Sequence, residues 1–180
     1  MASVRGLTFS VSHTTRAPRP GEKDGREYFF VTPARFRRMI ADGEFVEWAK
    51  VHSHSYGTSW KQLRAAQNAG NDILLDIDVQ GHQQVRKLLP EAVSVFVLPP
   101  SYQELERRLR RRHSDSAAAV RERLDNARRE MAHWVEYDYM VVNDRLLAAT
   151  KALQAVVIAG RLRRESQRER VQSICQTFGG

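Results

Sequence analysis

The chain has 180 residues, of which 42% are hydrophobic, and this length and composition fit one globular domain with a sizeable core. No apolar run is long enough to cross a bilayer, and the N-terminal segment lacks the apolar core of a signal peptide, so we expect a cytoplasmic protein. The single cysteine excludes an internal disulfide. The net charge of +8 indicates an anionic partner, and nucleic acid and nucleotide phosphates both fit. On charge alone, the basic surface could also be simply solvated.

Four apolar segments predict strands covered on both faces, because their hydrophobic residues are nearly continuous instead of alternating. They are residues 7–11, 72–77, 93–98 and 139–143. Residues 81–92 and 101–137 lie between the last three and have helical patterns, so the order of elements predicts βαβ units and a parallel sheet in an α/β fold. Residues 27–60 instead predict a small mixed α+β insertion, and residues 145–170 predict one helix that runs into an arginine-rich tail.

Helix starts are predicted from hydroxyl and acidic residues. Ser101 precedes Glu104 by three residues, the spacing of a capping box. A second helix within 101–137 is expected to follow a break at residues 113–115, with Ser114 or Asp115 as its N-cap.

The segment LLDIDVQG places two carboxylates, Asp76 and Asp78, at the end of an apolar strand. Residues two apart on a strand project from one face, and ligands of open α/β sheets bind beyond the carboxyl ends of the strands. The pair could therefore hold a ribose, a metal ion or another polar group. In the alternative interpretation, one acid caps the helix that begins near Gly81 and the other is solvated.

The segment SHTTRAPRPG predicts an anion site near the start of the chain. Arg16, Arg19 and, further on, Tyr28 supply two guanidinium groups and a phenol, which can share the oxygens of a phosphate. An ordinary surface turn is the competing interpretation.

Glu47 lies within the apolar segment FVEWA, where an ionised carboxylate is costly unless it is paired. A buried glutamate can accept hydrogen bonds from the N–H donors of a purine edge. The alternation of FVEWAKV also permits Glu47 to face solvent, since it is out of phase with Val46 and Trp48. Tyr56 and Thr58 add hydroxyl groups beside a turn.

Taken together, the motifs resemble those of the guanylate kinase family along nearly the whole chain. They are SVSHTTRAPRPGE, GREYFFV, GEFVEWA, YGTS, LLDIDVQG, FVLPPS, LERRLRRR, EYDYMVVND and IAGRLRR. The resemblance implies a P-loop-kinase-like parallel sheet flanked by helices in a single domain over residues 1–180, with a GMP-binding subdomain at 27–60 and a lid at about 107–128. It also implies transfer of the γ-phosphoryl group of ATP to GMP or dGMP, with Mg²⁺, in purine nucleotide metabolism.

The resemblance also carries site residues over to this sequence. The matches to GMP-binding positions are Ser12, Arg16, Arg19, Tyr28, Glu47, Tyr56, Thr58, Asp76 and Asp78, with the phosphate on Arg16, Arg19 and the two tyrosines and guanine read by Glu47, Ser12 and Thr58. The matches to catalytic positions are Arg16, Asp76, Arg108, Arg112 and Arg123, the last three being lid arginines near the ATP phosphates. Arg112, Asn143 and Asp144 match ATP-binding positions. The lid usually reads Arg-Gly-Arg-Gly in the family, whereas residues 110–113 read Arg-Arg-Arg-His, a difference that bears on lid flexibility.

The family's phosphate-binding loop, GxxxxGK followed by Ser or Thr, is absent from the sequence as printed, with the strand and helix around it, because no glycine precedes a lysine. Two interpretations are open: a start assigned downstream of the true one, which we favour, or a genuine short form that keeps only the GMP site. For this chain as given we expect weak ATP binding, little turnover and poor solubility.

Two other functions compete with the kinase. One is a catalytically inactive module that binds GMP or a protein, although the retained Glu47 and Thr58 are useful mainly for guanine. The other is a nucleic-acid binder, which rests only on the net charge and on arginine runs at 107–112 and 161–170. We do not expect nucleic-acid binding; the metal ligands and the oligomeric state are not predicted.

Overall fold

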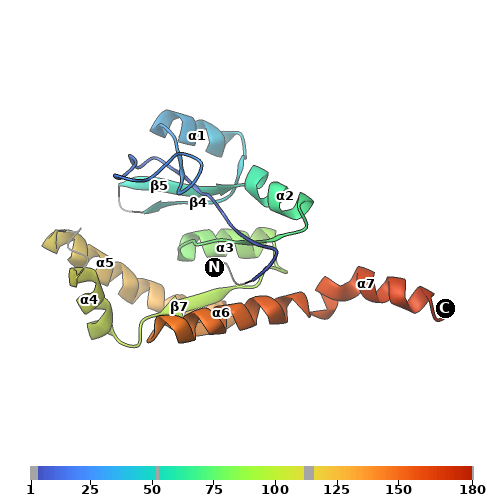
Figure 1. Ribbon diagram of the computed structural model, residues 1–180. Helices are drawn as coiled ribbons and strands as arrows, with labels where there is room; N and C mark the ends of the chain where they lie inside the picture. Colours follow the sequence, from blue (N-terminus) through green and yellow to red (C-terminus); the bar gives the residue numbers. More distant parts are fainter. Residues whose placement is uncertain (1–3, 52, 112–115, 180) are drawn as a thin grey trace. The chain divides into compact units, whose positions relative to one another are not determined.

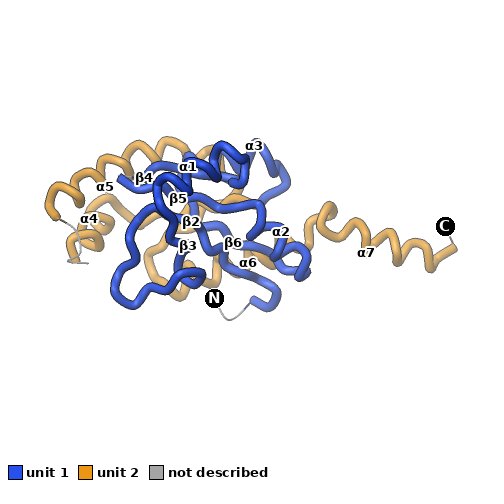
Figure 2. Tube along the Cα trace, turned by 90° about the horizontal axis from the view of Figure 1, so that it is seen from above, with its two compact units in different colours: residues 1–92 blue, residues 93–180 orange. Residues whose placement is uncertain are grey.

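The computed structural model describes residues 4–51, 53–111 and 116–179. The chain divides into two compact units, Met1–Ala92 and Val93–Gly180, which Figure 2 colours separately. Within the described ranges, no helix combines the length and apolar character that a membrane span requires.

The first unit begins with a parallel pair of strands, β1 (Leu7–Phe9) and β6 (Asp72–Leu74). Their pairing confirms the parallel arrangement predicted from continuous hydrophobicity. Both strands are shorter than predicted. Beyond Phe9 the chain leaves this pair and enters a second sheet at His13, and beyond Leu74 it runs without regular pairing into a helix.

The second sheet of this unit has four strands, in the order β3, β2, β5 and β4. These strands are Phe29–Phe30, His13–Thr14, His54–Ser59 and Phe45–Val51. β2 runs parallel to β3 and antiparallel to β5, and β5 runs antiparallel to β4. The predicted mixed insertion at 27–60 therefore forms as a mixed sheet with a helix, and the sheet also takes in β2, which precedes residue 27.

Three helices pack in the first unit: α1 (Pro33–Ala41), α2 (Trp60–Asn68) and α3 (Val79–Leu88). Figure 1 shows α1 on one side of β4 and β5 and α3 on the other. Neighbouring residues on β4 pack on opposite sides of the sheet: Phe45 packs with Phe36 of α1, whereas Val46 packs with Val85 of α3. The sheet that carries Glu47 is therefore held between two apolar layers.

The second unit contains a parallel pair of strands, β7 (Val95–Leu98) and β8 (Tyr139–Val142), as predicted. Its helices are α4 (Tyr102–Arg111), α5 (Ala117–Glu130), α6 (Leu146–Arg161) and α7 (Arg164–Gln176), with a 3₁₀ helix at Met131–Glu136. Leu109 of α4 packs against Val120 and Leu124 of α5.

The predicted single helix over 145–170 is wrong, because α6 ends at Arg161 and α7 begins at Arg164. Arg163 has extended backbone angles, φ −58° and ψ 144°, between the two helices. Side chains of α7 satisfy carbonyls at the end of α6: Ser166 Oγ donates to the Gly160 carbonyl at 3.0 Å, and Gln167 Nε2 donates to the Arg161 carbonyl at 2.7 Å. In the sequence, Ser166 and Gln167 were the missed signal for this break, because such polar side chains can compete for helix carbonyls.

The predicted helix starts are partly correct. Ser101 Oγ accepts from the backbone N–H of Glu104 at 3.1 Å, as an N-cap does. The carboxylate of Glu104, which the capping box would turn back toward Ser101, instead binds Arg107 and Arg108. The N-cap of α5 is Ser116, whose side chain accepts from Ala119, so Ser114 or Asp115 as the cap is wrong; both lie outside the described residues.

Replacing Thr32 by alanine should lower the free energy of unfolding by about 1 kcal/mol, the usual loss for a removed N-cap. Thr32 Oγ1 accepts from the backbone N–H of Arg35 at 3.2 Å and so caps α1. Urea denaturation measures the change, and Thr32→Ser is the matched control because it keeps the hydroxyl. An equal loss in both variants would contradict the capping role.

Candidate active site

The first unit gathers two of the predicted phosphate-binding side chains, Tyr28 and Tyr56, around a third, Arg16. Its guanidinium lies over the Tyr28 ring, with Cζ 5.4 Å from the ring centroid, and donates a hydrogen bond to Tyr56. The hydrogen bond to Glu22 is the main cause that raises the pKa of Arg16, and the one to Tyr56 adds to the rise. The Tyr28 and Tyr56 rings meet edge to face at 5.9 Å. One guanidinium and two phenols thus converge, whereas Arg19 is exposed.

Glu22 orients this cluster, and the sequence reasoning did not assign it a role. Its Oε1 accepts from Arg16 Nη2 at 2.8 Å, and its Oε2 accepts from the backbone N–H of Arg19 at 2.7 Å. Hydrogen bonds from Arg16 and from the Arg19 backbone lower the pKa of Glu22. The signal in the sequence was an acid three residues after Arg19, where it can close the turn on both arginines.

Glu47 is buried, with 4% of its surface exposed, so the solvent-facing alternative is wrong. The pairing of β4 with β5 shifts register between Phe45 and Glu47, and Phe45, Val46 and Glu47 are all buried in succession. A bulge breaks strict alternation, because it adds a residue to one strand and turns the following side chain. Trp48, the next residue, is exposed instead.

A chain of hydroxyl groups connects Glu47 to the rest of the sheet. Thr58 stands opposite Glu47 in the register and hydrogen-bonds to it, and Ser12 Oγ lies 3.4 Å from Thr58 Oγ1. Tyr56 and Thr58 lie two residues apart on β5, so their side chains project from the same face of the sheet. The predicted base-reading and phosphate-binding groups are therefore neighbours on one strand.

Burial raises the pKa of Glu47, hydrogen bonds from Thr58 oppose the rise, and the charge of Asp78 adds to it. The Glu47 carboxylate therefore binds a proton more readily in the folded protein than in the unfolded chain. By linkage, protonation of Glu47 stabilises the fold at low pH. This contribution is lost as the pH rises through the pKa of Glu47 in the folded protein, which lies above the usual value of 4.5.

The pH dependence can be isolated with Glu47→Gln, because glutamine cannot ionise. We expect the free energy of unfolding of the unaltered protein to fall relative to that of the variant as the pH rises from 4.5 toward 8. Urea titrations at several pH values measure the difference. A difference that stays constant with pH would contradict the raised pKa.

Asp76 and Asp78 do not lie on one face of a strand, because β6 ends at Leu74. Asp78 is the N-cap of α3, with Oδ1 accepting from the Gly81 N–H at 2.9 Å, so the alternative capping interpretation holds for this residue. Asp76 is exposed. Burial is the main cause that raises the pKa of Tyr28, and the charge of Asp76 adds to the rise. Within this loop, the field of Asp76 acts on the tyrosine and that of Asp78 acts on Glu47.

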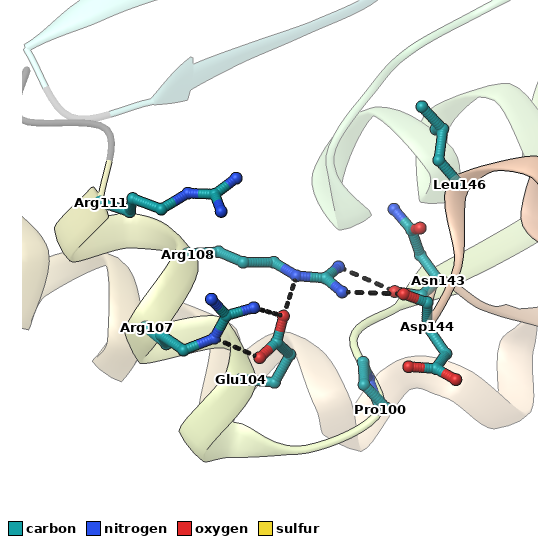
Figure 3. Close-up of a pocket in the computed structure, with 8 residues that line it drawn as sticks. All are labelled: Pro100, Glu104, Arg107, Arg108, Arg111, Asn143, Asp144 and Leu146. Carbon is teal, nitrogen blue, oxygen red and sulfur yellow. Dashed lines mark hydrogen bonds and ion pairs between the residues drawn. The ribbon is translucent and has the colours of Figure 1, made fainter.

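The second unit holds an open, arginine-lined pocket of about 640 Å³ (Figure 3). Its lining residues are Pro100, Glu104, Arg107, Arg108, Arg111, Asn143, Asp144 and Leu146. The predicted Arg108, Asn143 and Asp144 are thus brought together. Arg107 and Arg111 were not among the predicted residues, although they belong to the same arginine run on α4.

Arg108 is held by groups of its own unit. Its Nη1 donates to the Asn143 carbonyl at 2.7 Å, its Nη2 donates to the Asp144 carbonyl at 3.2 Å, and its Nε donates to Glu104. Hydrogen bonds from Arg107 and Arg108 lower the pKa of Glu104 to about 2. Arg108 therefore fastens α4 to the loop after β8. Arg123 lies half-buried on α5, and Arg112 lies outside the described residues.

Comparisons with known proteins show the family of the chain. The family model described as "Guanylate kinase" matches residues 3–159. A guanylate kinase of Aromatoleum aromaticum is 54% identical over 164 residues, which cover 91% of this chain and 80% of that protein. The chain belongs to the guanylate kinase family. A guanylate kinase of Methylobacillus flagellatus is 49% identical over 170 residues, which cover 94% of this chain and 84% of that protein.

The fold is also that of a guanylate kinase. The crystal structure of guanylate kinase from Anaplasma phagocytophilum matches with a TM-score of 0.75 and 34% identity, covering 88% of this chain and 77% of that one. The α/β fold with parallel strands flanked by helices is thereby confirmed, as is the kinase class of enzyme. Membership in the guanylate kinase family implies GMP and ATP as the substrates.

Proposed function

We propose that the first unit binds GMP and that the second unit contributes to binding ATP, whose γ-phosphoryl group passes to GMP to give ADP and GDP. The observation that carries the proposal is the buried carboxylate of Glu47 beside Thr58, on the same sheet as Tyr56 of the arginine–tyrosine cluster. A purine and a phosphate are the two ends of a nucleoside monophosphate. The site therefore has groups suited to both the base and the phosphate of GMP, the nucleotide that accepts the phosphoryl group.

Glu47 is suited to guanine among the purines. Guanine presents N–H donors at N1 and at its 2-amino group, and an ionised carboxylate accepts from both. Adenine presents an acceptor at N1, which would face the carboxylate oxygen without a proton between them. Thr58 and Ser12 supply further hydroxyl partners, so we assign the base to these three residues.

Arg16, Tyr28 and Tyr56 would hold the phosphate of GMP, with exposed Arg19 joining them. An arginine can donate two parallel hydrogen bonds to phosphate oxygens, and each is strengthened by the opposite charges. Phosphoryl transfer needs positioning and neutralisation of charge more than covalent chemistry. Fixed guanidinium groups supply both.

In the second unit, we assign the predicted lid arginines Arg108, Arg112 and Arg123 to the ATP phosphates, and Asn143 and Asp144 to the adenine. The arginine-lined pocket supports this assignment. Because Arg108 already binds two loop carbonyls, its first effect is to hold Asn143 and Asp144 in place.

Mg²⁺ would enter with ATP and neutralise charge on its phosphates. Among the residues that the structure describes, no three His, Cys, Asp or Glu side chains gather as a metal cage. Mg²⁺ commonly keeps several waters and takes only one or two carboxylates besides substrate phosphates. The exposed carboxylate of Asp76 fits that sparse donor set, and Asp78 fits less well because its oxygen caps α3.

Endpoint chromatography tests the reaction, because long incubation detects even slow turnover. The purified chain is incubated with ATP, Mg²⁺ and one of GMP, dGMP, AMP, CMP or UMP. We expect ADP together with GDP or dGDP, and no product from the other three. Preference for a different acceptor would refute the proposal. Binding of GMP without any product would support the inactive GMP-binding module instead.

A further inference from the structure

Gly81 is the closest approach of α3 to the carboxylate of Glu47. A Cβ built on Gly81 would lie 2.7 Å from Glu47 Oε2, 3.2 Å from Ile77 Cβ and 3.3 Å from Glu47 Cδ. Real Cβ atoms essentially never lie within 3.0 Å of another heavy atom, so the contact with Glu47 Oε2 is the one that requires a shift. The carboxylate therefore occupies the space that any other residue at position 81 would fill with its side chain.

The backbone at position 81 does not itself require glycine. Gly81 lies in the first turn of α3, and it is not one of the glycines with a positive φ. Glycine is one of the poorest residues for a helix interior, and alanine is the best. Gly81 therefore weakens α3 without relieving backbone strain. Its presence is explained by the space that it leaves for the Glu47 carboxylate.

The surrounding structure limits how this space could be made in another way. Gln84, one turn further along α3, binds both backbone groups of Trp48: its Oε1 accepts from the Trp48 N–H at 3.2 Å, and its Nε2 donates to the Trp48 carbonyl at 2.7 Å. Asp78 holds the Gly81 N–H at 2.9 Å. Gln84 thus joins α3 to β4 one turn beyond the contact, and Asp78 caps the start of α3 itself. Figure 1 shows α3 beside β4. The end of the Glu47 side chain is the part that can move.

We propose that Gly81 is a specificity-determining positioning residue, which lets the Glu47 carboxylate stand where it can read the guanine edge. This inference rests on the proposed role of Glu47. Gly81 touches no part of GMP in this account and acts only through Glu47. A methyl group at position 81 displaces the carboxylate and misaligns its hydrogen bonds with guanine, while the fold survives because a flexible side chain gives way.

The test is Gly81→Ala, with Gly160→Ala as the matched control. Both glycines are helical, but a Cβ at Gly160 would meet only Val93 Cγ2 at an ordinary 3.5 Å. Titration calorimetry should show GMP binding weakened about 10- to 100-fold by Gly81→Ala, the loss expected when a charge-assisted hydrogen bond is disrupted. Gly160→Ala should leave GMP binding unchanged, and neither variant should lower the melting temperature.

Glu47→Asp completes a double-mutant cycle, because the shorter side chain withdraws the carboxylate from position 81. We expect Gly81→Ala to weaken GMP binding less than about threefold in the Glu47→Asp background, since interacting residues are not additive. Equal losses in both backgrounds, or unchanged GMP binding in Gly81→Ala, would overturn the inference. A melting temperature lowered together with an additive cycle would show a merely structural role.

Glu47→Gln separates this inference from the proposed function. If Glu47→Gln weakens GMP binding and Gly81→Ala does not, Glu47 still reads guanine and only the role of Gly81 fails. If Glu47→Gln leaves GMP binding intact, the assignment of guanine to Glu47 fails, and the inference about Gly81 fails with it.

Discussion

Glu47→Gln is expected to weaken GMP binding by about 100- to 1,000-fold, because a site built around a buried acceptor is left with a mismatched partner. Glutamine replaces one acceptor oxygen by an NH₂ group that would face a guanine N–H donor. It also removes the negative charge that strengthens the remaining hydrogen bond. Titration calorimetry with GMP measures the loss.

Glu44→Gln is the matched control for this change. Glu44 lies three residues before Glu47, and its carboxylate pairs with Arg35 at 3.1 Å. The same chemical substitution there should leave GMP affinity within about twofold, since a single exposed ion pair contributes little. Equal losses in the two variants would show a general effect of charge and would count against a specific role for Glu47.

Arg16→Gln is expected to weaken GMP binding by about 100-fold while leaving guanosine binding unchanged, because Arg16 is assigned to the phosphate alone. Arg16→Lys should recover only part of the loss, since lysine keeps the charge but loses the planar fork and its bidentate geometry. Calorimetric titrations with GMP and with guanosine separate the two halves of the ligand.

Arg37→Gln controls for the loss of one positive charge in the same unit. Arg37 is exposed on α1 and lies outside the arginine–tyrosine cluster. Its substitution should change GMP affinity by no more than about twofold at moderate salt, where exposed charges are screened. If Arg16→Gln weakens guanosine and GMP equally, the phosphate assignment of Arg16 is wrong.

The parallel strands could be predicted because continuous apolar runs are a direct trace of burial on both faces. The strand ends could not, because they depend on where the chain changes sheets. β1 ends at Phe9, and the chain continues into β2, which pairs with β5 far along the sequence. Such long-range pairing leaves no local pattern.

The burial of Glu47 shows the same limit within the candidate site. Alternation left both a buried and a solvent-facing Glu47 open, and the bulge between Phe45 and Glu47 accompanies the buried one. The cap at Asp78 was foreseeable, since an acid three residues before Gly81 fits N-cap spacing. The contact between Gly81 and Glu47 was not, because it joins an element of the sheet to a helix 34 positions later in the numbering.

In the second unit, composition indicated arginines on α4 but not what they bind. Arg108 was expected near phosphate, and the structure shows it on the carbonyls of Asn143 and Asp144. Spacing along a helix predicts local partners such as Glu104, four residues before Arg108. Partners supplied by a distant loop become visible only in the fold.

Binding of GMP against AMP by the unaltered 180-residue chain, measured by titration calorimetry, tests the central claim most directly, because it asks whether the first unit reads a guanine nucleotide. We predict one GMP per chain and an affinity for AMP at least about 100-fold weaker, since adenine offers no N1–H or 2-amino donor to Glu47. Equal affinities for the two nucleotides, or no binding of GMP, would contradict the account.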